Sequence, residues 1–232
     1  TGAGAGSGDA EDAAGAVPLR GMRITAPDGT VLEGRYPTEG PYRGYRDHAL
    51  AIPRLHLDQI LVERVKALPV DVRERYRVED LLLDGGRVVG VRGVGPDGAA
   101  FEARSPLVVG ADGRQSLVAR RLGLVRAHAL RRMALLTYVG GIGDFGDSGE
   151  IYVDPPDYAI LNPVAPGTVS LSLVVPLDHA APFSGKLEAF FYARIKQLDH
   201  LQPRIATLRP LGPVVALGPL AYRVQPPRHG GV

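Results

Sequence analysis

The residues with the clearest potential for chemistry lie in the run 107–121, which reads LVVGADGRQSLVARR. Gly110 and Gly113 let the backbone approach a ligand closely, and a helix that starts after them favours anionic groups. Asp112 is placed to accept hydrogen bonds from a ribose hydroxyl or a water molecule, and Ser116 to cap the helix or contact a phosphate. An isolated Asp-Gly pair is most often only a turn, but here several features agree, which favours a ligand site.

Short strands and helices must position this run. A helix is predicted over 52–68, because apolar residues recur there at three- and four-residue spacing and Pro69 ends the run. A buried strand is predicted at 107–109 and a short helix over 115–122, with Gly123 as its C-terminal glycine. The strand signals before this run are two within 70–83, one at 87–94 and one at 100–104.

The pattern of apolar and turn-forming residues changes after about residue 127. Short β-type runs are separated there by turns rich in glycine and proline, which predicts an antiparallel sheet with one amphipathic helix at 187–198. A hairpin at 17–36, with its turn at 27–29, precedes the first helix. The runs expected as strands are 135–141, 150–153, 158–162, 169–176 and 214–220. The expected fold class is therefore α/β, with an α+β mixture of elements.

Composition and spacing exclude several kinds of site. The 232 residues include no cysteine, which excludes disulfides, cysteine-ligated metals and thiol catalysis. The 27 basic and 25 acidic side chains nearly balance, and the six histidines show no metal-ligand spacing. No Gly-x-Ser-x-Gly elbow occurs, and no apolar run approaches the about 20 residues of a membrane span. We expect a small-molecule substrate, a cytoplasmic location, and no metal, nucleic acid or integral membrane segment.

Residues 110–120 resemble the second flavin motif of the FAD-dependent monooxygenase superfamily, which includes para-hydroxybenzoate hydroxylase-like and geranylgeranyl reductase-like flavoproteins. That motif is a strand followed by Gly-Ala-Asp-Gly-x-x-Ser-x-hydrophobic-x-Arg. The resemblance implies that FAD is the cofactor and that NAD(P)H is the electron donor. It also implies that the aspartate touches the ribose of FAD. The cofactor-binding residues implied by this motif are Gly110, Asp112, Gly113 and Ser116.

Two upstream positions extend the resemblance. The helix start at 52–61 is similar to the family pattern Arg-x-x-hydrophobic-Asp-x-x-Leu, which places Arg54 at the flavin pyrophosphate. A guanidinium fork suits bidentate phosphate recognition, and a solvated arginine at a helix start is the alternative. Val78 stands where the family has a valine whose backbone pairs with the adenine, and an ordinary core strand residue is an equal alternative.

A third stretch, 155–163, resembles the Pro-x-x-Tyr-x-Trp-x-Phe-Pro box of geranylgeranyl reductases. Ile160 and Asn162 replace the two aromatic residues that help to shape the isoprenoid cavity in that family, which argues against a long lipid substrate. A strand with a proline at each end is an equal alternative for this stretch. Three tyrosines on the expected strands are candidate substrate contacts or ordinary core residues: Tyr138, Tyr152 and Tyr158.

The resemblance implies part of a Rossmann-like FAD-binding domain joined to a mostly antiparallel β-sheet substrate domain. The family's N-terminal Gly-x-Gly-x-x-Gly does not occur in residues 1–16, and its final Gly-Asp motif does not follow residues 218–224, which resemble the approach to it, so we expect an internal fragment of a longer protein. The expected parts are a flexible linker at 1–16, a hairpin and loop excursion toward the substrate side at 17–48, the FAD-binding part at 49–126, the substrate sheet at 127–221, and a return to the FAD-binding domain at 222–232.

Two classes of function stay open on these grounds. The first is an FAD-dependent oxidoreductase: either a hydroxylase that uses NAD(P)H and oxygen on an aromatic, polyketide-like or other apolar small molecule, or a geranylgeranyl reductase-like double-bond reductase. The second is a non-catalytic fragment, or a diverged ligand-binding relative without bound flavin. The sequence does not indicate an oligomeric state.

Overall fold

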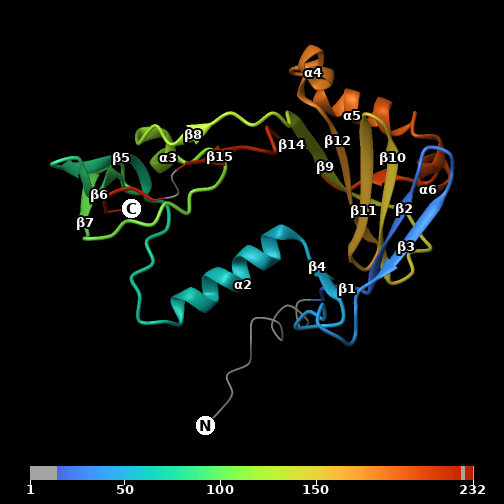
Figure 1. Cartoon of the computed structure of the whole chain (residues 1–232), viewed down its shortest axis with the longest axis horizontal. Coiled ribbons are helices and arrows are strands. Elements are labelled where there is room, and N and C mark those ends of the chain that lie inside the picture. Colours follow the sequence, from blue (N-terminus) through green and yellow to red (C-terminus); the bar gives the residue numbers. More distant parts are fainter. Residues whose placement is uncertain (1–14, 226–227, 232) are drawn as a thin grey trace, which may run out of the picture. The chain divides into compact units, whose positions relative to one another are not determined.

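Two groups of elements, each with its own sheet, make up the chain (Figure 1). The computed structural model describes residues 15–225 and 228–231, so the linker expected at 1–16 falls almost wholly outside the described residues. Contacts place the helix that follows the first hairpin in the first unit, whereas the expected division places it at the start of the FAD-binding part. The roles assigned to the parts stay a prediction. The described residues of the first unit are 15–68 and 131–220, and those of the second are 69–130, 221–225 and 228–231.

A large sheet forms the centre of the first unit, with the strand order β13-β9-β12-β11-β10-β2-β3 and β14 paired to β9. Neighbouring strands run antiparallel except β10 and β2, which are parallel. The expected antiparallel sheet and N-terminal hairpin are therefore confirmed. The strands are β2 (Gly21–Thr25), β3 (Val31–Arg35), β9 (Arg132–Gly140), β10 (Ser148–Asp154), β11 (Asp157–Ala165), β12 (Thr168–Pro176), β13 (Arg209–Pro210) and β14 (Val215–Leu217).

One face of this sheet carries the main hydrophobic core. Alternate residues of β9, β11 and β12, such as Leu135, Leu161 and Leu171, are buried against Phe191 and Ile195 of the covering helix. Phe191 is 0% exposed, so this helix is fixed to the sheet by one large aromatic side chain. The helical elements that follow β12 are α4 (Leu177–Ala180), η1 (Ala181–Phe183), α5 (Leu187–Ile195), η2 (Asp199–Leu201) and α6 (Gln202–Ile205).

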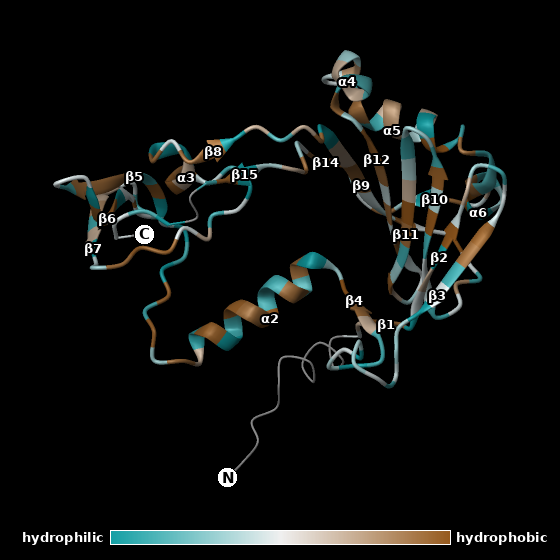
Figure 2. Cartoon of the chain, viewed as in Figure 1, coloured by the Kyte–Doolittle hydropathy of each residue, from teal (hydrophilic) through white to brown (hydrophobic). Residues whose placement is uncertain are grey.

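A short pair of strands, β1 (Val17–Leu19) and β4 (Ala49–Ala51), leads into the helix α2 (Arg54–Lys66). The expected helix is confirmed, and its apolar residues recur in bands along the ribbon in Figure 2. None of its residues is buried. With 13 residues, α2 is the longest helix of the described part and falls short of the about 20 residues that a membrane span requires.

The second unit is built on a small antiparallel sheet with the order β5-β6-β7. Its core joins Leu81 of β5 and Val88 of β6 to Val118 of a short helix. That helix, α3, was expected and is confirmed, with Gly123 just beyond its end at a φ of 64°. The elements of this unit are β5 (Arg77–Asp84), β6 (Arg87–Val94), β7 (Ala100–Arg104), α3 (Leu117–Arg121), β8 (Val125–Arg126) and β15 (Arg223–Val224).

Two expected strands are wrong. Residues 107–109 form no strand, and the side chains of Leu107 and Val109 are 61% and 78% exposed. An apolar run becomes a buried strand only where other strands flank it, and here the amide of Val108 bonds the carbonyl of Gly231 without a continuing ladder. The first of the two strands expected within 70–83 is also absent from the described residues, and β5 accounts for the second alone.

Candidate functional site

The Gly-Ala-Asp-Gly run forms a tight loop immediately before α3. Gly113 has a φ of 76°, in the left-handed region that glycine adopts without strain. Gly110 is required for a different reason, because an added Cβ would lie 2.9 Å from the Cβ of Val118. The two glycines therefore let the loop turn sharply and lie directly against the helix that follows.

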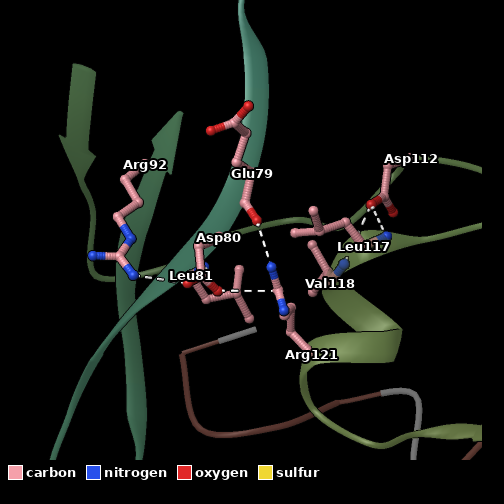
Figure 3. A network of polar contacts seen from close by, with 8 residues as sticks. All are labelled: Glu79, Asp80, Leu81, Arg92, Asp112, Leu117, Val118 and Arg121. Atoms are coloured by element: carbon pink, nitrogen blue, oxygen red, sulfur yellow. Dashed lines mark hydrogen bonds and ion pairs between the residues drawn. The ribbon is translucent and has the colours of Figure 1, made fainter. Parts of the chain in front are cut away.

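Asp112 is held by the first turn of α3, as Figure 3 shows. The amides of Leu117 and Val118 donate to its Oδ2 at 2.6 and 3.3 Å. Partial burial raises the pKa of the Asp112 carboxyl, but hydrogen bonds from the Ser116 hydroxyl and from these amides outweigh burial and hold the pKa below its usual value. Asp112 is therefore a charged carboxylate at neutral pH with a fixed orientation.

Ser116 is the N-cap of α3, and its Oγ accepts a hydrogen bond from the amide of Ala119 at 2.9 Å. The first amides of α3 thus already donate hydrogen bonds to the side chains of Asp112 and Ser116. The expectation that these amides attract an external anion is not supported by this geometry. What the loop offers a ligand is the open backbone at Gly113 and the Asp112 oxygen, Oδ1, that the two amides do not engage.

A hollow of about 250 Å³ lies beside this loop, within the second unit. Gly110, Gly113 and Ser116 line it together with apolar side chains, and an added Cβ at Gly113 would meet nothing within 4 Å. Open space, approachable backbone and a fixed carboxylate match what a sugar-phosphate ligand such as the ribose end of FAD requires. The residues present therefore fit the cofactor that the sequence resemblance implies.

An ion-pair network anchors α3 to β5 and was not expected from the sequence (Figure 3). Arg121 pairs with Asp80 at 3.1 Å and donates to the carbonyl of Glu79 at 3.0 Å. Arg92 bonds the other carboxylate oxygen at 2.8 Å, and this bond is the main cause that lowers the pKa of Asp80. The arginine pair 120–121 reads as an ordinary solvated face in the sequence, and no local pattern marks the partner 41 positions away.

Val78 lies on β5, next to this network, and its side chain is exposed. The strand pairing shifts between Val78 and Asp80, which leaves Glu79 outside the regular ladder and its carbonyl available to Arg121. The backbone is therefore irregular at the position assigned to the adenine. The assignment of Val78 itself stays a prediction.

Arg54 belongs to the first unit, whereas the Asp-Gly loop belongs to the second. The Arg54 guanidinium is exposed and bonds Asp58 one turn along α2 at 2.6 Å, and this bond raises the pKa of Arg54. Its amide donates to the hydroxyl of Tyr138 at 3.3 Å. The structure thus brings Arg54 together with one of the three tyrosines assigned to the substrate.

The three tyrosines do not share one face of the large sheet: Tyr152 lies on one face, and Tyr138 and Tyr158 lie on the other. Tyr152 is 4% exposed on the helix-covered face, and its hydroxyl donates to Glu150 at 2.7 Å; burial and this carboxylate raise its pKa to about 12. A structural role accounts for all of these contacts. Tyr138 and Tyr158 lie on the other face and are half-buried, with the guanidinium of Arg132 5.9 Å from the Tyr158 ring centroid. Only these two share a face.

Comparison with known sequences identifies the part of the chain around this loop. Residues 34–140 match the family described as FAD binding domain. The segment that leads into and includes this loop is therefore similar to FAD-binding domains.

Two reductases match this chain over 106 residues, or 46% of its length. Digeranylgeranylglycerophospholipid reductase 2 of Methanococcoides burtonii is 31% identical, and the digeranylgeranylglycerophospholipid reductase of Methanosarcina acetivorans is 32% identical. Each match covers 25% of the reductase. The chain thus spans about a quarter of the length of the curated relatives it matches.

Solved flavoprotein structures share the fold. The flavin-dependent halogenase CmlS superposes with a TM-score of 0.84 at 20% identity, covering 95% of this chain and 41% of CmlS. A geranylgeranyl bacteriochlorophyll reductase-like protein from Thermoplasma acidophilum gives 0.66 at 17%, covering 86% and 50%. PqsL, a probable FAD-dependent monooxygenase from Pseudomonas aeruginosa, gives 0.63 at 19%, covering 88% and 57%. The expected mixed α/β fold class is confirmed.

Metal chemistry has no evident site in the described part of the chain. Residues 15–225 and 228–231 contain no group of three or more histidine, aspartate or glutamate side chains placed to hold a metal ion.

Gly110 lies so close to Val118 that a larger residue there should destabilise the loop. We expect Gly110→Ala to lower the free energy of unfolding by about 1–3 kcal/mol, because the new methyl group would press on the stiff, buried side chain of Val118. Urea denaturation measures this change. Gly34→Ala is the matched control, since a Cβ added there meets nothing within 4 Å. Equal stabilities of the two variants would show that the loop does not lie against α3.

Proposed function

We propose that the protein is an FAD-dependent oxidoreductase acting on a small molecule, and that this chain supplies part of its cofactor site and a substrate-binding sheet. The observation that carries the proposal is the Gly-Ala-Asp-Gly loop, with its carboxylate fixed on α3, inside a segment that matches the FAD binding domain family. The reductases and the flavoprotein structures described above support the same reading.

Different residues of this chain are proposed to bind different parts of FAD. Asp112 Oδ1 would accept a hydrogen bond from a ribose hydroxyl, and the open backbone at Gly113 would let the sugar and phosphate approach, while Gly110 lets the loop lie against α3. Arg54 provides a guanidinium for the pyrophosphate after exchanging or sharing its bond to Asp58. FAD would supply the electron transfer when bound.

The face of the large sheet that carries Tyr138 and Tyr158 is the proposed substrate surface. Most of its residues are half-buried and apolar, which suits an apolar small molecule. Ile160 and Asn162 stand where geranylgeranyl reductases have aromatic residues, and this difference favours a hydroxylase over a reductase of long isoprenoids. NAD(P)H as the electron donor and a cytoplasmic location belong to the same proposal.

The absorption spectrum of the full-length gene product, purified without added cofactor, tests this function. We expect a yellow protein with flavin absorption bands that releases FAD on denaturation. Turnover with NAD(P)H, with and without oxygen, then divides a hydroxylase from a reductase. A folded, colourless protein that also fails to bind added FAD would refute the proposal and leave a non-catalytic relative, in which the Asp112 loop only makes a turn.

A further inference from the structure

A polar row crosses the face of the large sheet that the helices leave uncovered. Asn162 of β11 lies opposite Ser170 of β12, and Ser170 lies opposite Tyr138 of β9. On the other side of Asn162 lies Gly149 of β10, where an added Cβ would overlap the amide oxygen of Asn162. The row thus carries an amide, a hydroxyl and a phenol, and the missing side chain at Gly149 makes room for the amide.

The rest of this face is mainly apolar. The next row places Ile151, Ile160, Ser172 and Leu136 across the same four strands, and the row after it places Val153, Tyr158, Val174 and Ala134. Four residues separate Asn162 from Tyr158 along β11, a distance of about 14 Å at the usual rise of a strand. The face therefore offers one polar end and an apolar track long enough for a two-ring molecule.

The amide oxygen of Asn162 is buried and has no hydrogen-bond partner. The thioether of Met22, on β2, reaches the same space above Gly149, since its sulfur lies 2.8 Å from where a Cβ would be. A buried acceptor without a partner costs about 1–3 kcal/mol, which the protein alone does not recover. An apolar residue at this position would avoid that cost.

The unpartnered oxygen of Asn162 suits a ligand that carries a hydrogen-bond donor. Met22 is unbranched and flexible, so its thioether is the group most easily displaced from above the amide. A hydroxyl or N–H that takes its place would satisfy the Asn162 oxygen. Ser170, the next residue in the row, has a hydroxyl that can both donate and accept beside it. A purely hydrocarbon ligand would leave the amide unpaired.

We propose that Asn162 is a specificity-determining residue that selects small molecules with a hydrogen-bond-donating hydroxyl or N–H head and an apolar body lying along β11 toward Tyr158. The inference deepens the proposed function and rests on it, because it names the substrate class for the surface that function assigns. The inference is argued, however, from the strand register and from the unpartnered buried oxygen of Asn162, and it does not depend on the cofactor loop.

Binding of 2-naphthol and 2-methoxynaphthalene to the full-length protein tests the proposal. The two probes share their rings, but only 2-naphthol can donate a hydrogen bond, and the fluorescence of each reports its own Kd with or without flavin present. We expect the unmodified protein to prefer 2-naphthol by about 3- to 10-fold, the range of one neutral hydrogen bond. In Asn162→Leu the preference should disappear, and Asn162→Ala provides the same test if the leucine variant folds poorly.

Ser148→Ala is the matched control. Ser148 also has a buried oxygen without a partner, but strand alternation places it on the helix-covered face with Glu150 and Tyr152. Both substitutions remove an unsatisfied buried oxygen, so we expect both to raise the thermal midpoint. Only the Asn162 variants should change the ratio of the two Kd values.

The possible results separate this inference from the proposed function. If the protein contains FAD but binds neither probe, or if Asn162→Leu keeps the preference, the inference is wrong and the FAD-dependent function stands. If the protein binds no FAD, the redox function fails. The donor-selective site still stands in that case if the preference is present and is lost in Asn162→Leu.

Discussion

Replacing Arg204 by methionine is expected to lower the free energy of unfolding by about 3–5 kcal/mol, the cost of leaving a buried charge without its partner. Glu150 is 6% exposed, and Arg204 bonds both of its carboxylate oxygens, at 3.1 Å from Nε and 3.0 Å from Nη2. Arg204 also donates to the carbonyl of Gly143 and lies 4.7 Å from the ring centroid of Phe145. Without that guanidinium, Glu150 keeps the hydrogen bond from the Tyr152 hydroxyl and has Arg23 opposite it on β2, but it loses the bidentate bond to both of its carboxylate oxygens.

Urea denaturation of Arg204→Met and of two companion variants measures this cost. Arg73→Met is the matched control, since Arg73 forms an exposed ion pair with Asp71 at 2.7 Å and its loss should change stability by about 0.5 kcal/mol or less. The double variant Glu150→Leu/Arg204→Met should recover most of the loss, because it removes both charges. A loss in Arg204→Met no larger than that in Arg73→Met would show that Glu150 is not buried as described.

The local elements of both units could be predicted because they depend on short-range patterns. Apolar residues at three- and four-residue spacing with a terminal proline are enough to place α2, and a turn of Pro27-Asp28-Gly29 is enough to place the first hairpin. Alternation with a period of two likewise places the strands of the large sheet, because one face of each strand is buried. These features need no knowledge of distant residues.

Long-range pairing could not be predicted in the same way. The partner of Glu150 lies 54 positions along the chain and that of Asp80 lies 41 positions along, and nothing in either local sequence marks them. The run 107–109 has the composition of a buried strand, yet burial depends on flanking strands rather than on composition. The Asp-Gly motif is predicted as a site, but the capture of the α3 amides by Asp112 and Ser116 is visible only in the structure.

Asp112 has two proposed roles, because one carboxylate oxygen accepts from two α3 amides and the other is available to FAD. Asp112→Ala is expected to weaken FAD binding by about 10- to 100-fold, the range for a lost hydrogen bond to a charged group. It also removes the acceptor of two α3 amides, so stability should fall by about 1 kcal/mol. Titration of the flavin-free protein with FAD gives the first quantity, and urea denaturation without FAD gives the second.

Asp112→Asn separates the two roles of this residue. Asparagine keeps an amide oxygen for the two α3 amides but loses the negative charge at the helix start, so the stability of this variant should fall less than that of Asp112→Ala, by about 0.5 kcal/mol. Its bond to the ribose becomes a neutral one of roughly half the strength, so FAD binding should still weaken by about 10-fold. If FAD binding instead falls only in Asp112→Ala, and only as far as stability falls, then Asp112 caps α3 without touching the cofactor.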